Sequence, residues 1–358
     1  MYHILILHHN LVLNVLNKHN FDGFDFDWEY PAQRDTTYGS ADKENFVELL
    51  KVLKSKLSSN GKLLTIAVGA TASSASVSYD IPNVAANVDF INLMSYDLHG
   101  LWDSKTGINS PLYSGPSDVS SYEKQLNVDS IVNYWLNQGC PKSKLIVGIP
   151  LYGRTFTLAN SNNNGVGAPI YGGGEMGSFV PESGFLGYNE ICYNINNKGW
   201  RRFWEDTQKV PYAVSGNQWV GYDDAESLSY KLNYIKNRDL GGAMFWSIET
   251  DDFANICDKG KFPLIKAAFS ALINNSPVPI TTDKPNPTEN NGVTTTTTTT
   301  QKSNSGSICS NGDGIYPDPL DCNKFYICAA NVPYHQSCGV GLNFNPNGYC
   351  DWPYNFSC

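Results

Sequence analysis

Short apolar runs alternate with amphipathic stretches along the first 272 residues of the chain. Five runs have the length of a strand and end in polar or aromatic residues; they span 21–30, 62–70, 88–97, 144–153 and 241–250. An apolar stripe at helical spacing follows the first run and is made of Phe46, Leu49, Leu50, Leu53 and Leu57. This alternation predicts an α/β fold with a parallel sheet, either doubly wound or closed as a barrel. No Gly-rich phosphate loop follows any run, which disfavours the nucleotide-binding form.

Several helix starts are also expected from the pattern. A short amphipathic helix is predicted over Leu11–Asn20. Asp129 is placed to cap the helix that follows it, and Asp223 with Glu226 resembles a capping box ahead of the helix before Gly241.

The regular alternation stops between Phe156 and Trp219. This interval contains GAPIYGGGEMG, YNEICYN and KVPYAVSGNQWVG, which are typical of short antiparallel strands. We therefore predict an α+β insertion domain at about 157–218, after a strand and on the side where functional loops lie.

Composition separates the remainder of the chain into two parts. Residues 273–307 are rich in Thr, Pro and Asn, which predicts an extended linker. Residues 308–358 carry six of the nine cysteines, at positions 309, 322, 328, 338, 350 and 358. So short a segment cannot bury enough apolar surface, and it lacks the close C-x2-C pairs of zinc sites, so we expect a disulfide framework. Disulfides in turn predict a secreted, extracellular protein, and the sequence alone leaves their pairing open.

The net charge of −9 argues against nucleic acid and anionic membranes as partners, because both select for basic patches. No apolar stretch approaches the roughly 20 residues of a membrane span. We expect a monomer that needs no cofactor and no metal.

The candidate chemistry is concentrated in DGFDFDWEY at 22–30. In an extended segment, Asp25, Asp27 and Glu29 share one face, with about 6–7 Å between successive carboxylates. Their repulsion predicts at least one raised pKa and a shared proton, which suits acid–base work on a glycosidic bond. The alternatives are a solvated acidic edge and a calcium loop. Aromatic residues on the opposite face argue against the first, and the missing Gly of a calcium loop argues against the second.

The segment DGFDFDWEYP at 22–31 resembles the DGxDxDxEYP signature of glycoside hydrolase family 18, the chitinases. Four further segments agree in order: MSYD at 94–97, KLIVGIPLYGRTF at 144–156, QWVGYDD at 218–224 and GGAMFWSIETDDF at 241–253. The resemblance implies a (β/α)8 TIM barrel over residues 1–272. In the family the acidic motif lies on the fourth strand, so we expect an N-terminally truncated barrel with about five of eight strands.

The resemblance also implies roles for individual residues. Glu29 would be the general acid and base, and Asp27 would bind the acetamido N–H so that the sugar's own carbonyl oxygen attacks. Asp25 would share a proton with Asp27, and Tyr96 would position the acetamido group. The substrate-binding residues implied are Tyr30, Met94, Asp97, Trp102, Tyr152, Arg154, Glu182 and Trp246, with Met244 as a weaker candidate. Trp102 and Trp219 are each either a sugar subsite or a residue that packs a loop.

The cysteine-rich tail resembles the peritrophin-A-type chitin-binding domain, by its cysteine spacing and by CDWP at 350–353. That family implies the disulfides Cys309–Cys328, Cys322–Cys358 and Cys338–Cys350. The family 18 resemblance implies Cys192–Cys257 and leaves Cys140 without a partner. Tyr334, Phe344 and Trp352 would either stack on a polysaccharide or fill the small core.

These features together predict a secreted, endo-acting chitinase anchored by its tail. Its partners would be chitin and N-acetylglucosamine oligomers. The alternatives are an inactive, lectin-like chitin-binding protein, a matrix protein that uses only its tail, or a non-functional fragment.

Overall fold

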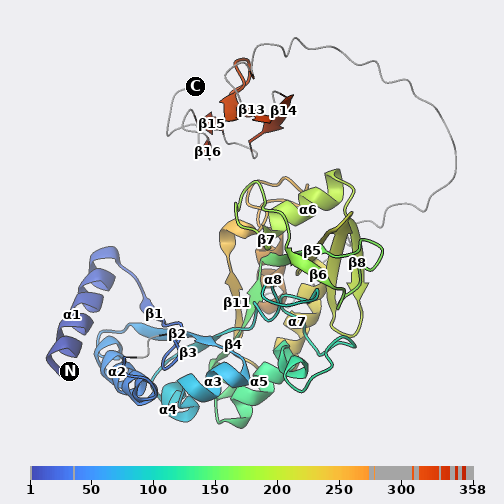
Figure 1. Cartoon of the computed structure of the whole chain (residues 1–358). Coiled ribbons are helices and arrows are strands. Elements are labelled where there is room, and N and C mark those ends of the chain that lie inside the picture. The colour runs from blue at the N-terminus through green and yellow to red at the C-terminus, as the bar shows by residue number, and fades with distance from the viewer. Residues whose placement is uncertain are drawn as a thin grey trace. The chain divides into compact units, whose positions relative to one another are not determined.

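The structure is a computed structural model, and it describes residues 2–34, 37–273, 278, 309, 314–329, 332–338, 343–345 and 349–351. The chain divides into two compact units (Figure 1). The larger contains residues 1–177 and 182–285, and the smaller contains residues 178–181 and 286–358. The predicted linker lies almost wholly outside the described residues.

A parallel sheet of five strands is the centre of the larger unit, in the order β1-β2-β3-β4-β11. The strands are β1 (Gly23–Asp27), β2 (Leu63–Gly69), β3 (Phe90–Met94), β4 (Leu145–Pro150) and β11 (Gly242–Trp246). Successive side chains of each strand point to opposite faces of the sheet. One face packs on helices, and the other face is concave. The prediction of an α/β barrel sheet with five strands is confirmed. Among the described residues no pairing joins β1 to β11, so the sheet is an open arc.

Helices cover the outer face of this sheet (Figure 1). They are α1 (Tyr2–His19), α2 (Ala41–Ser58), α3 (Ala72–Ser78), α4 (Ile81–Ala86), α5 (Val128–Asn137), α7 (Ala225–Asn237) and α8 (Pro263–Ile273). Single turns occur in the connections, at η1 (Glu123–Gln125), η2 (Lys142–Lys144) and η3 (Ile248–Thr250). The helix α1 begins well before the predicted Leu11, because no Gly or Pro interrupts the run from Tyr2. None of the described helices combines the length and apolarity needed to cross a membrane.

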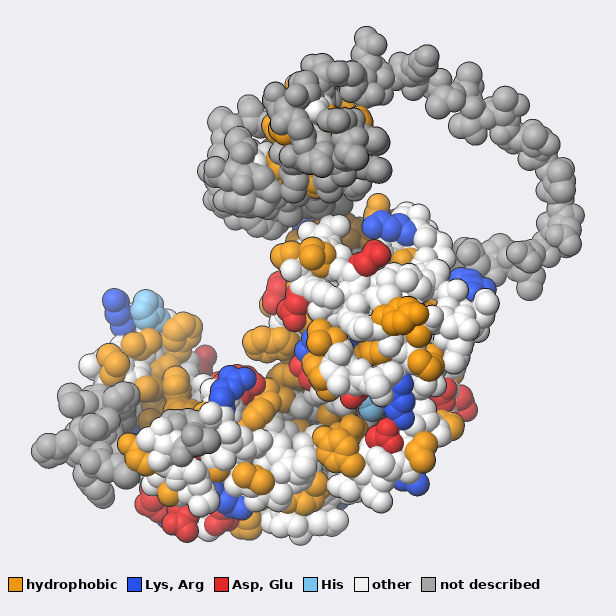
Figure 2. Space-filling view, viewed as in Figure 1, with side chains coloured by type: hydrophobic (Ala, Val, Ile, Leu, Met, Phe, Trp, Pro, Cys, Tyr) orange, Lys and Arg blue, Asp and Glu red, His pale blue; other side chains and the backbone are white. Residues whose placement is uncertain are grey.

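The concave face of the sheet lies in a hollow on the surface of the larger unit, visible in Figure 2 between the α1 end and the part that carries β11. Apolar side chains on this face are open to solvent. Leu63 is 45% exposed and Phe90 is 39% exposed. The next residues of the same strands, Leu64 and Ile91, face the helices and are fully buried.

The insertion forms a second, antiparallel sheet in the order β6-β5-β10-β9-β8, with β7 paired to β5. Its elements are β5 (Tyr152–Leu158), β6 (Ile170–Gly173), β7 (Phe185–Gly187), α6 (Tyr188–Asn197), β8 (Arg201–Glu205), β9 (Val210–Ser215) and β10 (Gln218–Gly221). This sheet therefore starts at Tyr152 and ends at Gly221, wider than the predicted 157–218. The apolar run 144–153 is divided at Leu151 between β4 and β5, so Tyr152 and Arg154 belong to the insertion sheet.

Two predicted helix caps were wrong by one or two residues. Asn127 caps α5, since its side chain accepts the N–H of Ser130; Asp129 instead accepts the Tyr234 hydroxyl at 2.7 Å. Asp224 caps α7, while Asp223 forms an ion pair with Lys231. In both cases the tertiary partner was invisible in the local pattern.

The smaller unit contains a three-stranded antiparallel sheet and a two-stranded one. The strands are β12 (Gly314–Pro317), β13 (Lys324–Ala329), β14 (Val332–Ser337), β15 (Asn343–Asn345) and β16 (Tyr349–Asp351). Cys309, Cys322 and Cys338 are disulfide-bonded, but the predicted pairings involve side chains outside the described residues. Phe344 is buried and stacks on Phe325 with ring centroids 4.6 Å apart, so it fills the core rather than offering an exposed ring. The side chains of Tyr334 and Trp352 lie outside the described residues.

Candidate active site

The acidic motif lies on β1 and just beyond its carboxyl end. Phe26 and Trp28 point to the helices, where their rings lie 5.8 Å and 5.7 Å from the ring of Phe46. Period-two alternation therefore turns Asp25 and Asp27 to the concave face, and both are exposed there. Functional groups of TIM barrels occur at this carboxyl end of the strands.

Asp25 is held by the two neighbouring strands. Its Oδ1 accepts hydrogen bonds from Thr65 Oγ1 on β2 and from Asn92 Nδ2 on β3, the latter at 3.0 Å. Sequence reasoning missed Thr65 and Asn92. Their signal was weak: each is a polar residue at an inward position of an otherwise apolar strand.

Asp27 lies between two other carboxylates. Desolvation, and then repulsion from Glu29 and Asp25, raise the pKa of Asp27, although the side chain still reaches water. The strand itself ends at Asp27, so Glu29 follows in a bend two residues later. The three acids form one electrostatic group. Only Asp25 and Asp27 share the predicted strand face, because the strand ends before Glu29.

Two tyrosines border this acidic group. Burial, and then the charge of Glu29, raise the pKa of Tyr30 to about 12. Tyr96 is nearly buried, and burial followed by the charges of Asp97 and Asp27 raises its pKa above the usual range. The hydroxyl of Tyr96 lies 3.8 Å from the sulfur of Met244 on β11. Both phenols therefore stay protonated beside the acids and can donate hydrogen bonds.

Asp97 is the centre of a second polar group. Its Oδ1 accepts hydrogen bonds from Tyr152 Oη and Arg154 Nε, each at 2.7 Å. Burial, and then the charge of Asp97, raise the pKa of Tyr152 as well. The side chains from β5 therefore meet the loop after β3 directly beside Tyr96, whose ring centroid is 6.1 Å from that of Tyr152.

Aromatic rings surround the guanidinium of Arg154. Its carbon lies 5.3 Å from the ring centroid of Trp102 and 5.6 Å from that of Phe185. Phe185 also stacks on Tyr152, with centroids 4.5 Å apart. Phe185 was missed by the sequence reasoning, because it lies on a three-residue strand inside the insertion. Glu182 is exposed and close enough to act on the charge of Arg154.

The remaining candidates lie at strand ends, with one exception. Trp246 ends β11 and is 54% exposed, so its ring is free to contact a ligand. Met94 ends β3 and is half-buried. Trp219 is fully buried in the core of the insertion, 5.5 Å from the ring of Phe156, so its assignment as a subsite candidate was wrong.

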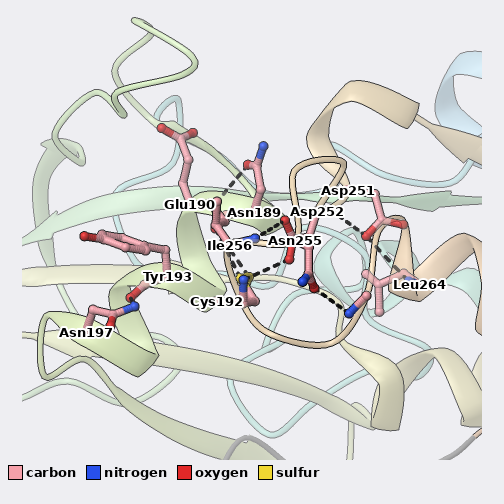
Figure 3. The surroundings of a disulfide bond; sticks show 12 residues. Asn189, Glu190, Cys192, Tyr193, Asn197, Asp251, Asp252, Asn255, Ile256 and Leu264 are labelled. Carbon is pink, nitrogen blue, oxygen red and sulfur yellow. Dashed lines mark hydrogen bonds between the residues drawn. A yellow bond between two sulfur atoms is a disulfide. The ribbon is translucent and has the colours of Figure 1, made fainter. Parts of the chain in front are cut away.

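A disulfide joins Cys192 of α6 to Cys257 in the segment after β11, the pair that the resemblance implied (Figure 3). The carboxylate of Asp252 accepts the N–H groups of Ile256 and Cys257, each at 2.9 Å. Among the described residues, Cys192, Asp252 and Cys257 have the spacing of a metal site, but the disulfide consumes both thiols and leaves no thiolate ligand. Cys140 is a buried free cysteine, and burial raises the pKa of its thiol to about 11.

An arc of parallel strands with acids, tyrosines and exposed rings at its carboxyl edge is the arrangement of a TIM-barrel enzyme, and paired carboxyl groups are what most glycoside hydrolases use. Comparison with known families agrees: Glycosyl hydrolases family 18 matches residues 9–251, and Chitin binding Peritrophin-A domain matches residues 309–358. The chain belongs to glycosyl hydrolases family 18 and carries a C-terminal domain of the chitin-binding type.

Three similar proteins illustrate the range of the family. Chitotriosidase-1 of Mus musculus is 39% identical over 354 residues, which are 94% of this chain and 73% of that protein. The Group IV chitinase of Ostrinia furnacalis in complex with allosamidin superposes with a TM-score of 0.72 at 43% identity, over 75% of this chain and 72% of that one. Human YKL-39 is described as a pseudo-chitinase that retains chitooligosaccharide binding. It has a TM-score of 0.68 at 40% identity, over 74% of this chain and 72% of its own.

Proposed function

We propose that this protein hydrolyses β-1,4-N-acetylglucosamine linkages in chitin, as an endo-acting enzyme with a substrate-assisted, retaining mechanism. The observation that carries the proposal is the group of three acids, Asp25, Asp27 and Glu29, in which the charges of the two neighbours add to desolvation in raising the pKa of Asp27. Carboxyl groups that interact in this way can share a proton, while another carboxyl of the group does acid–base work.

In this mechanism Glu29 protonates the leaving glycosidic oxygen. Asp27 accepts the acetamido N–H, so that the acetamido carbonyl oxygen attacks C1 and closes an oxazolinium ring. Glu29 then removes a proton from the incoming water, which opens the ring and restores the acid. Asp25, fixed by Thr65 and Asn92, receives the proton from Asp27 when the acetamido group binds.

The second polar group would hold the sugar in place. Tyr96 carries a protonated hydroxyl beside the acids and can donate a hydrogen bond to the acetamido oxygen. Tyr152 already donates to Asp97, and would position that carboxylate and the Tyr96 ring. Asp97 and Arg154 would bind sugar hydroxyls, and the exposed rings of Trp102 and Trp246 would stack on sugar faces. Tyr30, Met94 and Glu182 would complete the lining.

Domain roles are part of the same proposal. Residues 1–272 would form the catalytic part, 273–307 the linker, and 308–358 the module that anchors the enzyme to insoluble chitin. The disulfide-bonded cysteines support secretion, since such bonds persist outside the cytosol. We propose a monomer as the working form.

The test compares the chain with its Glu29→Gln variant on fluorogenic N-acetylglucosamine oligomers and on chitin beads. Loss of the general acid should lower turnover by at least about 100-fold and leave bead binding unchanged. Equal turnover in both proteins would remove Glu29 from its role.

The second candidate is an oligosaccharide-binding protein without hydrolysis, favoured by the likeness to the pseudo-chitinase YKL-39. It predicts that the unmodified chain binds oligomers but does not cut them. The presence of all three acids in this chain, Asp25, Asp27 and Glu29, favours the enzyme.

A further inference from the structure

Ser95, Tyr96 and Asp97 form the start of the loop after β3, and none of the three lies in a helix or strand. The backbone of Asp97 has a positive φ of 56°, in the left-handed region that Asp enters more readily than most residues other than Gly and Asn. Hydrogen bonds on either side of Tyr96 hold this loop.

Two consecutive buried residues, Asn109 and Ser110, form hydrogen bonds to the backbone on either side of Tyr96. The Oδ1 of Asn109 accepts the backbone N–H of Asp97 at 2.8 Å, one residue after Tyr96. The hydroxyl of Ser110 donates to the backbone carbonyl of Ser95 at 2.7 Å, one residue before it. Asn109 and Ser110 are both fully buried. We call this pair the 109–110 clasp.

The clasp also reaches the insertion sheet. The Nδ2 of Asn109 donates to the backbone carbonyl of Tyr152 at 3.0 Å. The hydroxyl of Tyr152 in turn donates to the carboxylate of Asp97. Asn109, Tyr152 and Asp97 therefore form a closed ring of hydrogen bonds, in which one amide sets the distance between the β3 loop and the start of β5.

A buried ion pair between Lys231 and Asp223 contacts Ser110 of the clasp. The ammonium of Lys231 on α7 donates to the Ser110 carbonyl at 2.6 Å, to the Ser110 hydroxyl at 3.0 Å and to Asp223 at 2.7 Å. All three donors of Lys231 are therefore used in a fully buried position. Polar groups buried at such cost, and completely satisfied, fix a single local arrangement.

We propose that Asn109 and Ser110 are positioning residues of the active site, which hold Tyr96 and Asp97 at the distance from Tyr152 that sugar binding requires. This inference rests on the proposed function of that site. Neither residue touches the ligand itself, because both are closed off from solvent.

The first test is a double-mutant cycle with Asn109→Ala and Asp97→Asn, read as kcat/KM on soluble oligomers and as oligomer affinity by tryptophan fluorescence. Asn109→Ala alone should lower kcat/KM by about 10-fold or more, since small misplacements of positioned groups have effects of that size. In the Asp97→Asn background the same change should lower kcat/KM by a smaller factor than it does alone, because part of its effect passes through the Asp97 carboxylate. Full additivity would overturn the proposal.

Asn127→Ala is the matched control. Asn127 is also a buried asparagine with two hydrogen bonds to the backbone: it accepts the Ser130 N–H and donates to the Lys124 carbonyl. It caps α5, and neither bond goes to the residues around Tyr96. It should lower the melting temperature and leave kcat/KM within about 2-fold. An equal loss of kcat/KM in Asn127→Ala and Asn109→Ala would reduce Asn109 to a structural residue.

Asn109→Asp and Ser110→Ala keep the test informative if Asn109→Ala does not fold. The carboxyl introduced by Asn109→Asp still accepts from Asp97, but it donates to the Tyr152 carbonyl only when protonated. Its kcat/KM relative to the unmodified chain should therefore rise as the pH falls. A flat ratio, together with unchanged kcat/KM in Ser110→Ala, would overturn the proposal.

The possible outcomes distinguish the proposed hydrolysis from the proposed positioning role of the 109–110 clasp. If the unmodified chain binds oligomers without cutting them, hydrolysis is excluded, and the same cycle read as affinity decides the role of the clasp. If it cuts oligomers and the cycle is additive, hydrolysis stands and the clasp fails. If it neither binds nor cuts, both are overturned.

Discussion

The pKa of Asp27 depends on acids that are close to it in the sequence. The position of Asp27 two residues from each of two other acids follows from the primary structure, and the strand turns it to the concave face with Asp25. Desolvation and the charges of Glu29 and Asp25 raise its pKa, which means that the folded protein holds this proton more tightly than the unfolded chain does.

Asp27→Asn should therefore change the pH dependence of stability. A carboxyl whose pKa is higher in the folded state does not destabilise the protein below its unfolded pKa. The loss of folding stability that it causes grows as the pH rises from there through the folded pKa. The melting temperature of Asp27→Asn minus that of the unmodified chain should thus increase between about pH 3 and pH 7. A gap that stays flat or narrows with rising pH would contradict the assignment.

Asp80→Asn provides a control of opposite sign. The side chain of Asn83 donates to Asp80 at 2.8 Å and lowers the pKa of that carboxyl. Because the pKa of Asp80 is lower in the folded state, its charged carboxyl stabilises the protein above the unfolded pKa. This stabilisation is lost as the pH falls through the folded pKa. The gap in melting temperature for Asp80→Asn should therefore become more negative as the pH rises.

At the scale of elements, α2 holds the acidic strand in place. Phe46 on this helix is buried, and its ring contacts Phe26 and Trp28 of the acidic segment as well as Tyr79, with centroids 5.7–6.1 Å apart. These contacts fix which face of β1 points outward, and so which face carries the carboxylates.

Phe46→Ala should lower the free energy of unfolding by about 3–5 kcal/mol, because it removes a buried ring and leaves a cavity between α2 and β1. Urea unfolding followed by circular dichroism measures this loss. Phe269→Ala on α8, whose side chain is 59% exposed, should stay within about 0.5 kcal/mol. Equal effects in the two variants would mean that α2 does not support the strand as described.

At the scale of the whole molecule, the chain combines a family 18 barrel unit with a chitin-binding type of domain. In the proposed function, anchoring through this domain would raise the local substrate concentration without changing the chemistry. Within the larger unit, the disulfide between Cys192 and Cys257 bridges 65 residues and stabilises the join of insertion and barrel by about 2–4 kcal/mol.

Deletion of residues 308–358 should weaken binding to chitin beads and leave hydrolysis of short soluble oligomers within about 2-fold. Pull-down on beads and a parallel assay on soluble oligomers measure the two effects. Unchanged bead binding after the deletion would refute the anchoring role of the tail.

The sequence alone determined the five barrel strands, the antiparallel insertion and the common face of Asp25 and Asp27. These features depend on strand periodicity and on the order of apolar runs, which are local properties. Only the tertiary structure decided that Trp219 and Phe344 are buried, that Asn127 rather than Asp129 caps α5, and that Thr65, Asn92, Phe185 and Asn109 support the site. Such contacts depend on the register between distant segments, which no local pattern encodes.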